Sequence, residues 1–333
     1  MKNSSCTTSF ELIDLHPAQA DVVAAVHQGL ERRPRQLPAW LLYDQKGSEL
    51  FDAITRQPEY SLTRTEQALL TSKGSEITTS LPAGCLLVEF GAGSAEKVSP
   101  LLDAMEDPAY VAIDISAAHL VSAGERLQQR HPSIPMLGLC ADYSQPLELP
   151  LPSQMLRRPR VGFFPGSSLG NFCPNQAITF LIRLRQLLGP KGMLLIGIDQ
   201  PREPALLEAA YDDAAGISAA FALNLLRRLQ RDLGAKLNVD GFSYQARWDE
   251  ANSRIAMALV AKGEQQLILA GLESCFAPGE ELITEYSYKF SPKEFLTLAA
   301  RAGWQKRDRW SDNREHFSVH LLEPCDGEQT AEG

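Results

Sequence analysis

The amino-acid sequence predicts an α/β protein built on a doubly wound, mostly parallel sheet. Between Cys85 and Asp199, short apolar runs alternate with segments of helical periodicity. Such runs are typical of parallel strands buried on both faces, and the helices supply the crossovers between them. The first run also ends in a Gly-x-Gly turn, Gly91 to Gly93. Ligands of these sheets bind at the carboxyl ends of the strands, so we expect the functional residues there.

The predicted elements of this sheet follow one another with short connections. The predicted strands are Cys85–Phe90, 110–116, 135–143, 160–166 and 192–199. The predicted helices between them are 96–105, 118–130 and 175–189. Strands separated by helical crossovers make a doubly wound α/β sheet.

The rest of the chain has a different pattern. A helix is predicted over Asp21–Arg33, residues 204–234 are helical, residues 242–272 alternate and turn like a hairpin, and residues 281–324 read strand, helix, strand, strand. We therefore infer an insertion between the last two parts of one α/β core, together with N-terminal helices. The predicted parts are an N-terminal helical part (1–60), the core (61–199), an insertion (200–284), a return to the core (285–324) and a tail (325–333).

Composition restricts the partners. A net charge of −9 opposes binding to nucleic acid, which calls for a basic surface. No stretch reaches the roughly 20 apolar residues of a membrane span, and the N-terminus lacks the pattern of a secretory signal, so we expect a cytoplasmic protein without membrane contact. No zinc-binding motif occurs, so no metal is predicted. A monomer is expected.

Three consecutive strand ends carry groups suited to adenosine. Gly91 and Gly93 let a ligand approach the backbone, but Glu96 replaces the third small residue of the dinucleotide fingerprint, and no phosphate-binding P-loop is present. Asp114 is placed to accept both ribose hydroxyl protons, and Asp142 with Tyr143 can hold the adenine. Adenosine without a diphosphate cradle indicates S-adenosylmethionine rather than NAD.

Other interpretations stay open at this point. Asp114 and Asp142 can serve as turn or helix-cap residues only. An NAD-dependent dehydrogenase, a non-catalytic S-adenosylmethionine-binding protein and a nucleic-acid methyltransferase are the rival functions. The sequence lacks the diphosphate cradle that a dehydrogenase requires. It also lacks the basic charge and the N-P-P-Y or D-P-P-Y tetrapeptide that would indicate a nucleic-acid methyltransferase.

Several longer motifs carry a more specific likeness. In order, they are YDQKGSELFDAITRQPEYSLTRTE, VEFGAGSAEK, FFPGSSLGNF, AAYDDAAGISAAF and TEYSYKF. With them the sequence resembles the ergothioneine-pathway L-histidine Nα-methyltransferases, which are related to fungal N-methyltransferases of ergot-alkaloid synthesis. The resemblance implies a Rossmann-like class I S-adenosylmethionine-dependent methyltransferase core. It also implies a second, α+β substrate-binding domain, made of the N-terminal helical part (1–60) and completed by the insertion (200–284). It implies cofactor contacts from Gly91, Lys97, Asp114, Asp142 and Tyr143.

The same resemblance implies the substrate site. Tyr43 and Asn171 are the expected catalytic residues, and the expected substrate-binding residues are Tyr60, Gly166, Asn171, Tyr211, Met257, Glu285 and Ser287. Glu285 and Ser287 would hold the side chain. A neutral imidazole has one donor and one acceptor nitrogen, which a carboxylate and a hydroxyl on one face of a strand can match.

The implied reaction is transfer of three methyl groups to the α-amino nitrogen of L-histidine, giving trimethylhistidine (hercynine) for ergothioneine synthesis. The nearest rival is the same chemistry on an aromatic amino acid such as tryptophan, whose indole offers a donor but no acceptor. Each residue also has a purely structural interpretation: Tyr43 and Tyr60 as packing at a domain seam, Asn171 as a helix cap, and Met257 as core. Asp212 and Asp213 are expected to be solvent-facing or interdomain groups. The sequence identifies no general base.

Overall fold

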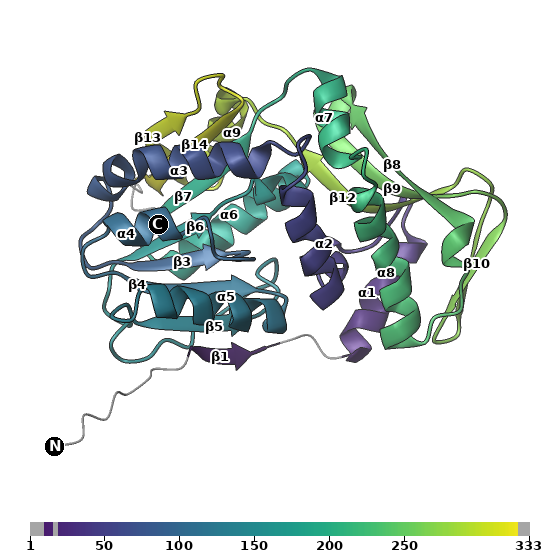
Figure 1. Ribbon diagram of the computed structural model, residues 1–333, viewed down its shortest axis with the longest axis horizontal. Helices are drawn as coiled ribbons and strands as arrows, with labels where there is room; N and C mark the ends of the chain where they lie inside the picture. The colour runs from purple at the N-terminus through teal and green to yellow at the C-terminus, as the bar shows by residue number, and fades with distance from the viewer. Residues whose placement is uncertain (1–9, 16–18, 326–333) are drawn as a thin grey trace, which may run out of the picture.

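The computed structural model describes residues 10–15 and 19–325, which form two main sheets side by side (Figure 1) and a separate two-stranded sheet. The larger sheet has eight strands, in the spatial order β1 (Glu11–Asp14), β5 (Met136–Cys140), β4 (Ala109–Asp114), β3 (Leu86–Phe90), β6 (Arg160–Phe164), β7 (Met193–Asp199), β14 (Phe317–Pro324) and β13 (Trp304–Ser311). The first six strands in this spatial order are parallel to one another. The last two, β14 and β13, are antiparallel and lie at one edge of the sheet. The doubly wound α/β fold is confirmed.

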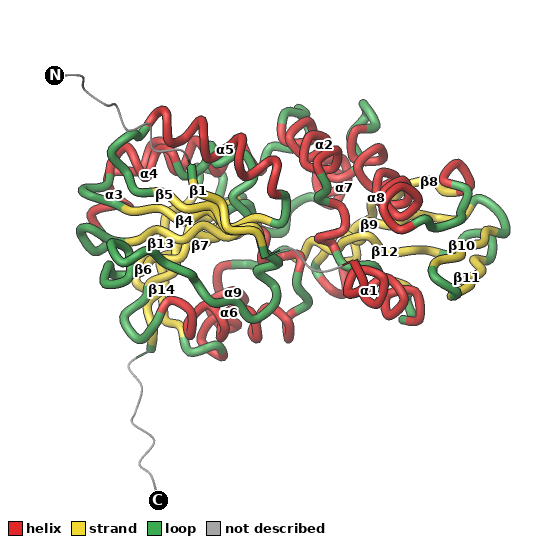
Figure 2. Tube along the Cα trace, turned by 90° about the horizontal axis from the view of Figure 1, so that it is seen from below, coloured by secondary structure: helices red, strands yellow, loops and turns green. Residues whose placement is uncertain are grey.

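Helices cover both faces of the larger sheet (Figure 2). On one face lie α3 (Leu62–Thr79), α4 (Ser99–Ala104) and α5 (Ala117–Arg130). On the other lie α6 (Pro174–Leu188) and α9 (Pro292–Arg301). The strands β3 and β5 are buried at every position, as their continuous apolar sequence predicts.

The smaller sheet belongs to the second domain. Its strands are, in order, β2 (Arg35–Gln36), β12 (Glu281–Tyr288), β9 (Arg254–Ala261) and β8 (Phe242–Asp249), and a separate hairpin is formed by β10 (Gln265–Leu269) and β11 (Leu272–Phe276). The helices around it are α1 (Gln19–Glu31), α2 (Gln45–Thr55), α7 (Pro204–Tyr211) and α8 (Ile217–Leu233). In Figure 2, α2, α7 and α8 lie on one side of this sheet and α1 on the other. The N-terminal and inserted segments thus build one unit.

Two segments lie elsewhere than predicted. Residues Glu11–Asp14, expected in the helical part of the substrate domain, form the edge strand β1 beside β5. Four residues are too short for a periodic signal, and Phe10 anchors them by packing its ring where a Cβ on Gly124 or Gly138 would lie. The boundary at 284/285 falls inside β12, which pairs with β9 from Glu281 to Tyr288. The chain returns to the larger sheet only after Tyr288.

Helix boundaries also differ in detail. The helix predicted from Glu96 begins at Ser99, because the chain turns first and Ala95 adopts a left-handed conformation with φ of +56°. The long helical stretch 204–234 is broken into α7 and α8 by residues 212–216. In the described part of the chain, no helix combines the length and apolar character of a membrane span.

Candidate active site

The Gly-x-Gly turn lies at the carboxyl end of β3, in the middle of the larger sheet. Gly91 has a φ of +74°, a conformation that glycine adopts without steric cost. Its N–H donates to the carbonyl of Ile113 at 2.8 Å, which ties the turn to the end of β4. A Cβ on Gly91 would lie 3.5 Å from the Tyr143 hydroxyl, so the tyrosine lies directly beside the turn.

Asp114, the last residue of β4, closes the same turn. Its Oδ2 accepts from the Gly93 N–H at 2.8 Å and its Oδ1 from the Ser116 N–H at 3.0 Å. Burial raises the pKa of Asp114, and these backbone hydrogen bonds oppose the rise. Asp114 is therefore a turn residue and also a carboxylate at the carboxyl end of a strand, so its role in the turn does not exclude a role in binding a ligand.

Asp142 and Tyr143 follow the end of β5. The Asp142 Oδ1 accepts from the Ser144 N–H at 2.9 Å, which fixes a tight turn. The Tyr143 ring packs edge-on against Phe90 and Phe164, with ring centroids 6.4 and 5.7 Å apart. Three neighbouring strand ends thus carry the predicted cofactor residues at one edge of the sheet.

Lys97 connects this edge to the end of β6 through a buried carboxylate. Its Nζ lies 2.8 Å from Glu66 Oε2, and both oxygens of Glu66 accept from the Gly166 N–H at 2.9 Å. Glu66 is completely buried in α3. Gly166 has a φ of +79°, which favours glycine, and a Cβ there would lie 3.0 Å from Lys97 Nζ, so the lysine approaches the backbone closely.

A cavity of about 70 Å³ adjoins Gly166, between the two sheets. It is lined by side chains from both domains, namely Tyr43, Phe51, Ile54, Tyr60, Gly166, Ser167, Ser168, Asn171, Ala210, Tyr211, Ser218, Phe221, Tyr244, Met257, Glu285 and Ser287. Every residue predicted for catalysis or substrate binding is among them, whereas Gly91, Lys97, Asp114, Asp142 and Tyr143 are not. The close approach of Lys97 to Gly166 joins the two groups at one point.

Asn171 and Glu285 form a polar pair in the cavity wall. Asn171 ends the short 3₁₀ segment Ser168–Asn171, and its Nδ2 donates to Glu285 Oε1 at 2.7 Å. Burial raises the pKa of Glu285 to about 8, although Lys289 and the Asn171 hydrogen bond lower it. Asn171 is no helix cap, because α6 is capped by Cys173. Because Nδ2 donates to Glu285, the side chain is held with its Oδ1 as the atom that can accept a hydrogen bond from a ligand.

A second polar group joins Tyr211 at the end of α7 to Ser287 on β12. The Tyr211 hydroxyl lies 2.9 Å from Ser287 Oγ, and Lys289 Nζ donates to both, at 2.7 and 2.9 Å. Lys289 also forms an ion pair with Asp199 at 2.8 Å. The break before α8 holds Tyr211 in place, since the Asp213 carboxylate accepts from the N–H groups of residues 217 and 218. Asp213 is thus structural.

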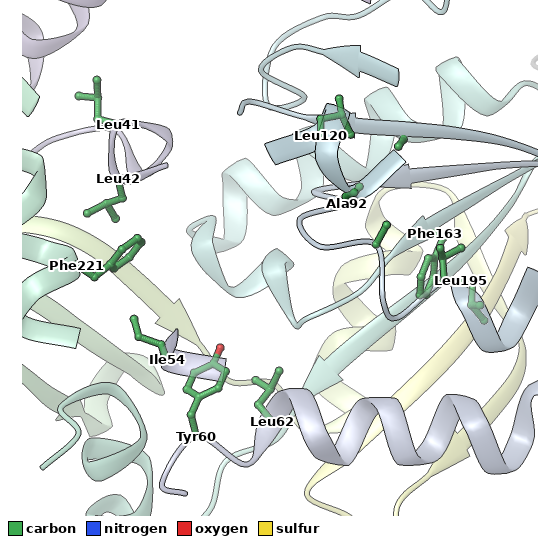
Figure 3. Packing of buried hydrophobic residues seen from close by; sticks show 14 of the residues in the cluster. Leu41, Leu42, Ile54, Tyr60, Leu62, Ala92, Leu120, Phe163, Leu195 and Phe221 are labelled. Carbon is green, nitrogen blue, oxygen red and sulfur yellow. The ribbon is translucent and has the colours of Figure 1, made fainter. Parts of the chain in front are cut away.

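Aromatic rings line the cavity together with the polar groups. Tyr43 packs edge-on against Phe51 and Phe221, at centroid distances of 5.6 and 5.4 Å. The following Asp44 caps α2 through Gly47 N–H and accepts from Asn224 on α8, which holds this loop against the second domain. Figure 3 shows Tyr60 beside Leu62, the first residue of α3. Ile54 and, farther away, Phe221 lie on the other side of the Tyr60 ring.

The two phenols keep their protons at neutral pH. Burial raises the pKa of Tyr43 well above its ordinary value, with the negative charge of Glu285 the next cause. Burial and the neighbouring Tyr211 do the same for Tyr60. Both are therefore hydrogen-bond donors. Met257 packs with Leu207, Ala246 and Ile255 and also lines the cavity, so it is both core and wall.

The strand ends fit S-adenosylmethionine. Each Asp114 oxygen is held by one backbone donor and can accept another, as ribose hydroxyls require. The Lys97 ammonium has protons left, beyond its pair with Glu66, for the carboxylate of the methionine part. A Cβ on Gly93 would meet nothing within 4 Å, so the space above the turn is open. Among the described residues, no group of three or more His, Cys, Asp and Glu side chains is placed to hold a metal ion.

Three buried residues of this arrangement were missed from the sequence. They are Glu66, Asp199 and Lys289. Glu66 and Lys289 lie inside motifs that the sequence displays, TRTE and TEYSYKF, but neither was given a role. For Lys289 the available signal was a charged residue next to aromatic residues, since charged residues are seldom fully buried unless they are paired.

Known proteins give a consistent picture. Residues 22–324 match a family described as histidine-specific methyltransferase, SAM-dependent. The chain is 38% identical to the histidine N-alpha-methyltransferase of Mycolicibacterium smegmatis, over 89% of this chain and 92% of that protein. It is 31% identical to ergothioneine biosynthesis protein 1 of Neurospora crassa, over 87% of this chain and 33% of that protein.

A more distant relative represents the rival substrate. The 4-dimethylallyltryptophan N-methyltransferase of Epichloe festucae var. lolii is 26% identical, over 90% of this chain and 94% of that protein. The family match nevertheless spans nearly the whole described chain. The chain therefore belongs to the histidine-specific, S-adenosylmethionine-dependent methyltransferases, the family that its motifs resemble.

Proposed function

We propose that this methyltransferase adds three methyl groups in turn to the α-amino nitrogen of L-histidine, giving the trimethylated betaine hercynine for ergothioneine synthesis. The observation that carries the proposal is the pair of polar groups in one cavity wall, Asn171 with Glu285 and Tyr211 with Ser287. The relatives named histidine N-alpha-methyltransferase and ergothioneine biosynthesis protein 1 support the substrate and the pathway.

The amine end of the substrate belongs with Asn171. When bound, S-adenosylmethionine supplies an electrophilic methyl group on a sulfonium. Because Asn171 Nδ2 is engaged by Glu285, its Oδ1 can accept from an amine N–H and orient the nitrogen lone pair. Tyr43 and Tyr60 contribute protonated hydroxyls for the substrate carboxylate. Proximity and orientation are the main sources of rate enhancement in such a site.

The aromatic walls suit a growing cation. A methylated ammonium loses hydrogen-bond donors with every step, so a fixed carboxylate partner would be of decreasing use. Tyr43, Phe51 and Tyr60 line the cavity, and aromatic rings attract a quaternary ammonium by cation–π interaction without requiring donors. This feature supports three successive transfers.

The imidazole end belongs with Glu285 and Ser287. Both lie on β12 and point from it into the cavity. An ionised or protonated Glu285 can pair with one ring nitrogen, and the hydroxyl group serves the other. An indole has a single ring nitrogen, so it can pair with only one of these two side chains. Leaving a buried polar group without a partner costs about 1–3 kcal/mol, which favours histidine over tryptophan by roughly tenfold or more.

Mass spectrometry of free amino acids incubated with enzyme and S-adenosylmethionine tests the proposal. We expect histidine to gain one, two and then three methyl groups, and Nα-acetylhistidine, whose amine is blocked, to gain none. Methylation of tryptophan alone would overturn the substrate assignment. Methylation of the blocked histidine would place the reaction on the ring.

Further expectations concern the surroundings of the site. A cytoplasmic monomer without nucleic-acid partners stays a prediction. Gel filtration with light scattering checks the oligomeric state, and titration with duplex DNA or RNA at low salt checks the exclusion of nucleic acid, since such binding is strongest there.

A further inference from the structure

Lys289 is a buried cation with no direct place in the cavity wall. It follows β12, is 1% exposed, and meets Asp199 at the end of β7. The other Asp199 oxygen, Oδ1, lies 2.6 Å from Arg202, so the carboxylate is shared by two cations. Burial lowers the pKa of Lys289, but the charge of Asp199 more than offsets this and the net shift is upward. The lysine is therefore a lasting positive charge at the seam of the two sheets.

The protons of this group can be counted. An ammonium has three, and Lys289 Nζ has three oxygen neighbours, on Asp199, Tyr211 and Ser287, at 2.8, 2.7 and 2.9 Å. Both hydroxyls therefore accept from the lysine. The hydroxyls also lie 2.9 Å from each other, so one of their two protons is used between them. A single hydroxyl proton is left, and it is free to point into the cavity.

We propose that Lys289 is a positioning residue that determines specificity, because it fixes the Tyr211–Ser287 pair as a hydrogen-bond donor toward the substrate. The ligand atom that faces this remaining proton must then be an acceptor. A neutral imidazole offers such an atom on the nitrogen opposite the one that serves Glu285, whereas a pyrrole or indole ring offers only an N–H. The inference rests on the proposed function. It assigns the preference for imidazole over pyrrole or indole rings to Lys289, a residue outside the cavity wall.

The test compares two substrates that differ in one ring atom. Histidine and 3-(2-pyrrolyl)alanine have rings of similar size, but the pyrrole lacks the acceptor nitrogen. We expect the unmodified enzyme to prefer histidine in kcat/KM by about tenfold or more, the usual effect of one unmatched buried polar group. In Lys289→Met the hydroxyls can reorient, so we expect that preference to fall by about tenfold, with the Kd for S-adenosylmethionine unchanged.

Two further variants make the result decisive. Lys293→Met removes the same charge from an exposed position on α9 and should retain the full preference. Asp199→Asn with Lys289→Met removes both members of the ion pair and should lose the preference as Lys289→Met does, even if the single variant folds poorly. Equal losses of kcat/KM for both substrates, or a preference unchanged in a folded variant, would overturn the inference. If the unmodified enzyme fails to methylate histidine, the proposed function itself is wrong.

Discussion

The cofactor edge and the substrate cavity are held together in different ways. At the edge, backbone groups do most of the holding: the N–H groups of Gly93 and Ser116 bind Asp114, and the N–H of Ser144 binds Asp142. In the cavity, side chains hold side chains, as with Asn171 and Glu285. The backbone arrangement follows from strands and turns that recur along the chain. The side-chain arrangement depends on individual residues from distant segments, so single substitutions should disturb it more selectively.

The largest expected effect breaks the cavity and leaves the edge intact. Asn171→Ala removes the amine-orienting oxygen and leaves Glu285 without its donor. We expect kcat/KM for histidine to fall by about 100-fold or more, because two buried interactions are lost at roughly 1–3 kcal/mol each. Calorimetric titration should show an unchanged Kd for S-adenosylmethionine. Asn175→Ala, on the exposed side of α6, is the matched control and should behave like the unmodified enzyme.

The converse substitution, at Asp114, should weaken the cofactor edge and leave the substrate cavity intact. Asp114→Asn keeps the size of the side chain but places an NH₂ group against a backbone donor and removes the charge. We expect S-adenosylmethionine to bind about tenfold more weakly, the cost of roughly one such hydrogen bond. Exposed Glu125→Gln on α5 removes a charge without this effect. An unchanged Kd in Asp114→Asn would remove this residue from the cofactor site.

A smaller effect is expected within the cavity, on the choice of substrate. Glu285→Ala removes the partner of one imidazole nitrogen but also leaves Asn171 free to turn. Competition assays with histidine and tryptophan should show the preference for histidine falling by roughly tenfold, while methylation of tryptophan falls less. If both substrates lose activity in equal proportion, Glu285 supports the cavity without reading the side chain.

The smallest expected effect is a change in the pH dependence of folding stability, caused by the buried carboxyl group of Glu89. Burial raises the pKa of Glu89, on β3, from 4.5 to about 8, although its hydrogen bond from Tyr110 lowers it. A carboxyl group with a raised folded-state pKa contributes stability below its unfolded pKa and loses it as pH rises toward 8. In Glu89→Gln this loss cannot occur.

Thermal melts over this pH range check the prediction. We expect the Tm of the unmodified protein to fall more steeply with rising pH than that of Glu89→Gln. Exposed Glu106→Gln should follow the unmodified protein. Parallel curves for all three proteins would mean that Glu89 is ionised in the folded state at neutral pH.

The difference between the two regions also explains what the sequence could predict. The Gly91 turn and Asp114 lie at strand ends that local apolar runs reveal, and the structure places both at one edge of the larger sheet. The cavity residues came from longer motifs, since no periodicity brings Asn171 to Glu285. Lys289 was overlooked because its partner, Asp199, lies on a strand of the other sheet. The pattern of β12 is that of a strand but does not say which sheet it joins, which is why the boundary at residue 285 was wrong.

The seam between β7 and β12 has a consequence for how the protein can be rebuilt. The chain leaves the larger sheet after Asp199 and comes back at Phe290, whose N–H donates to the Asp199 carbonyl at 3.3 Å. Segments with adjacent ends can be exchanged between proteins with little strain on the host fold. Residues 200–289 therefore form an insertion whose two ends are adjacent. The insertion also contacts the N-terminal part of the chain, because β2 pairs with β12 and α2 packs on α8. A graft of substrate preference from a relative must therefore carry the segment 19–60 along with it.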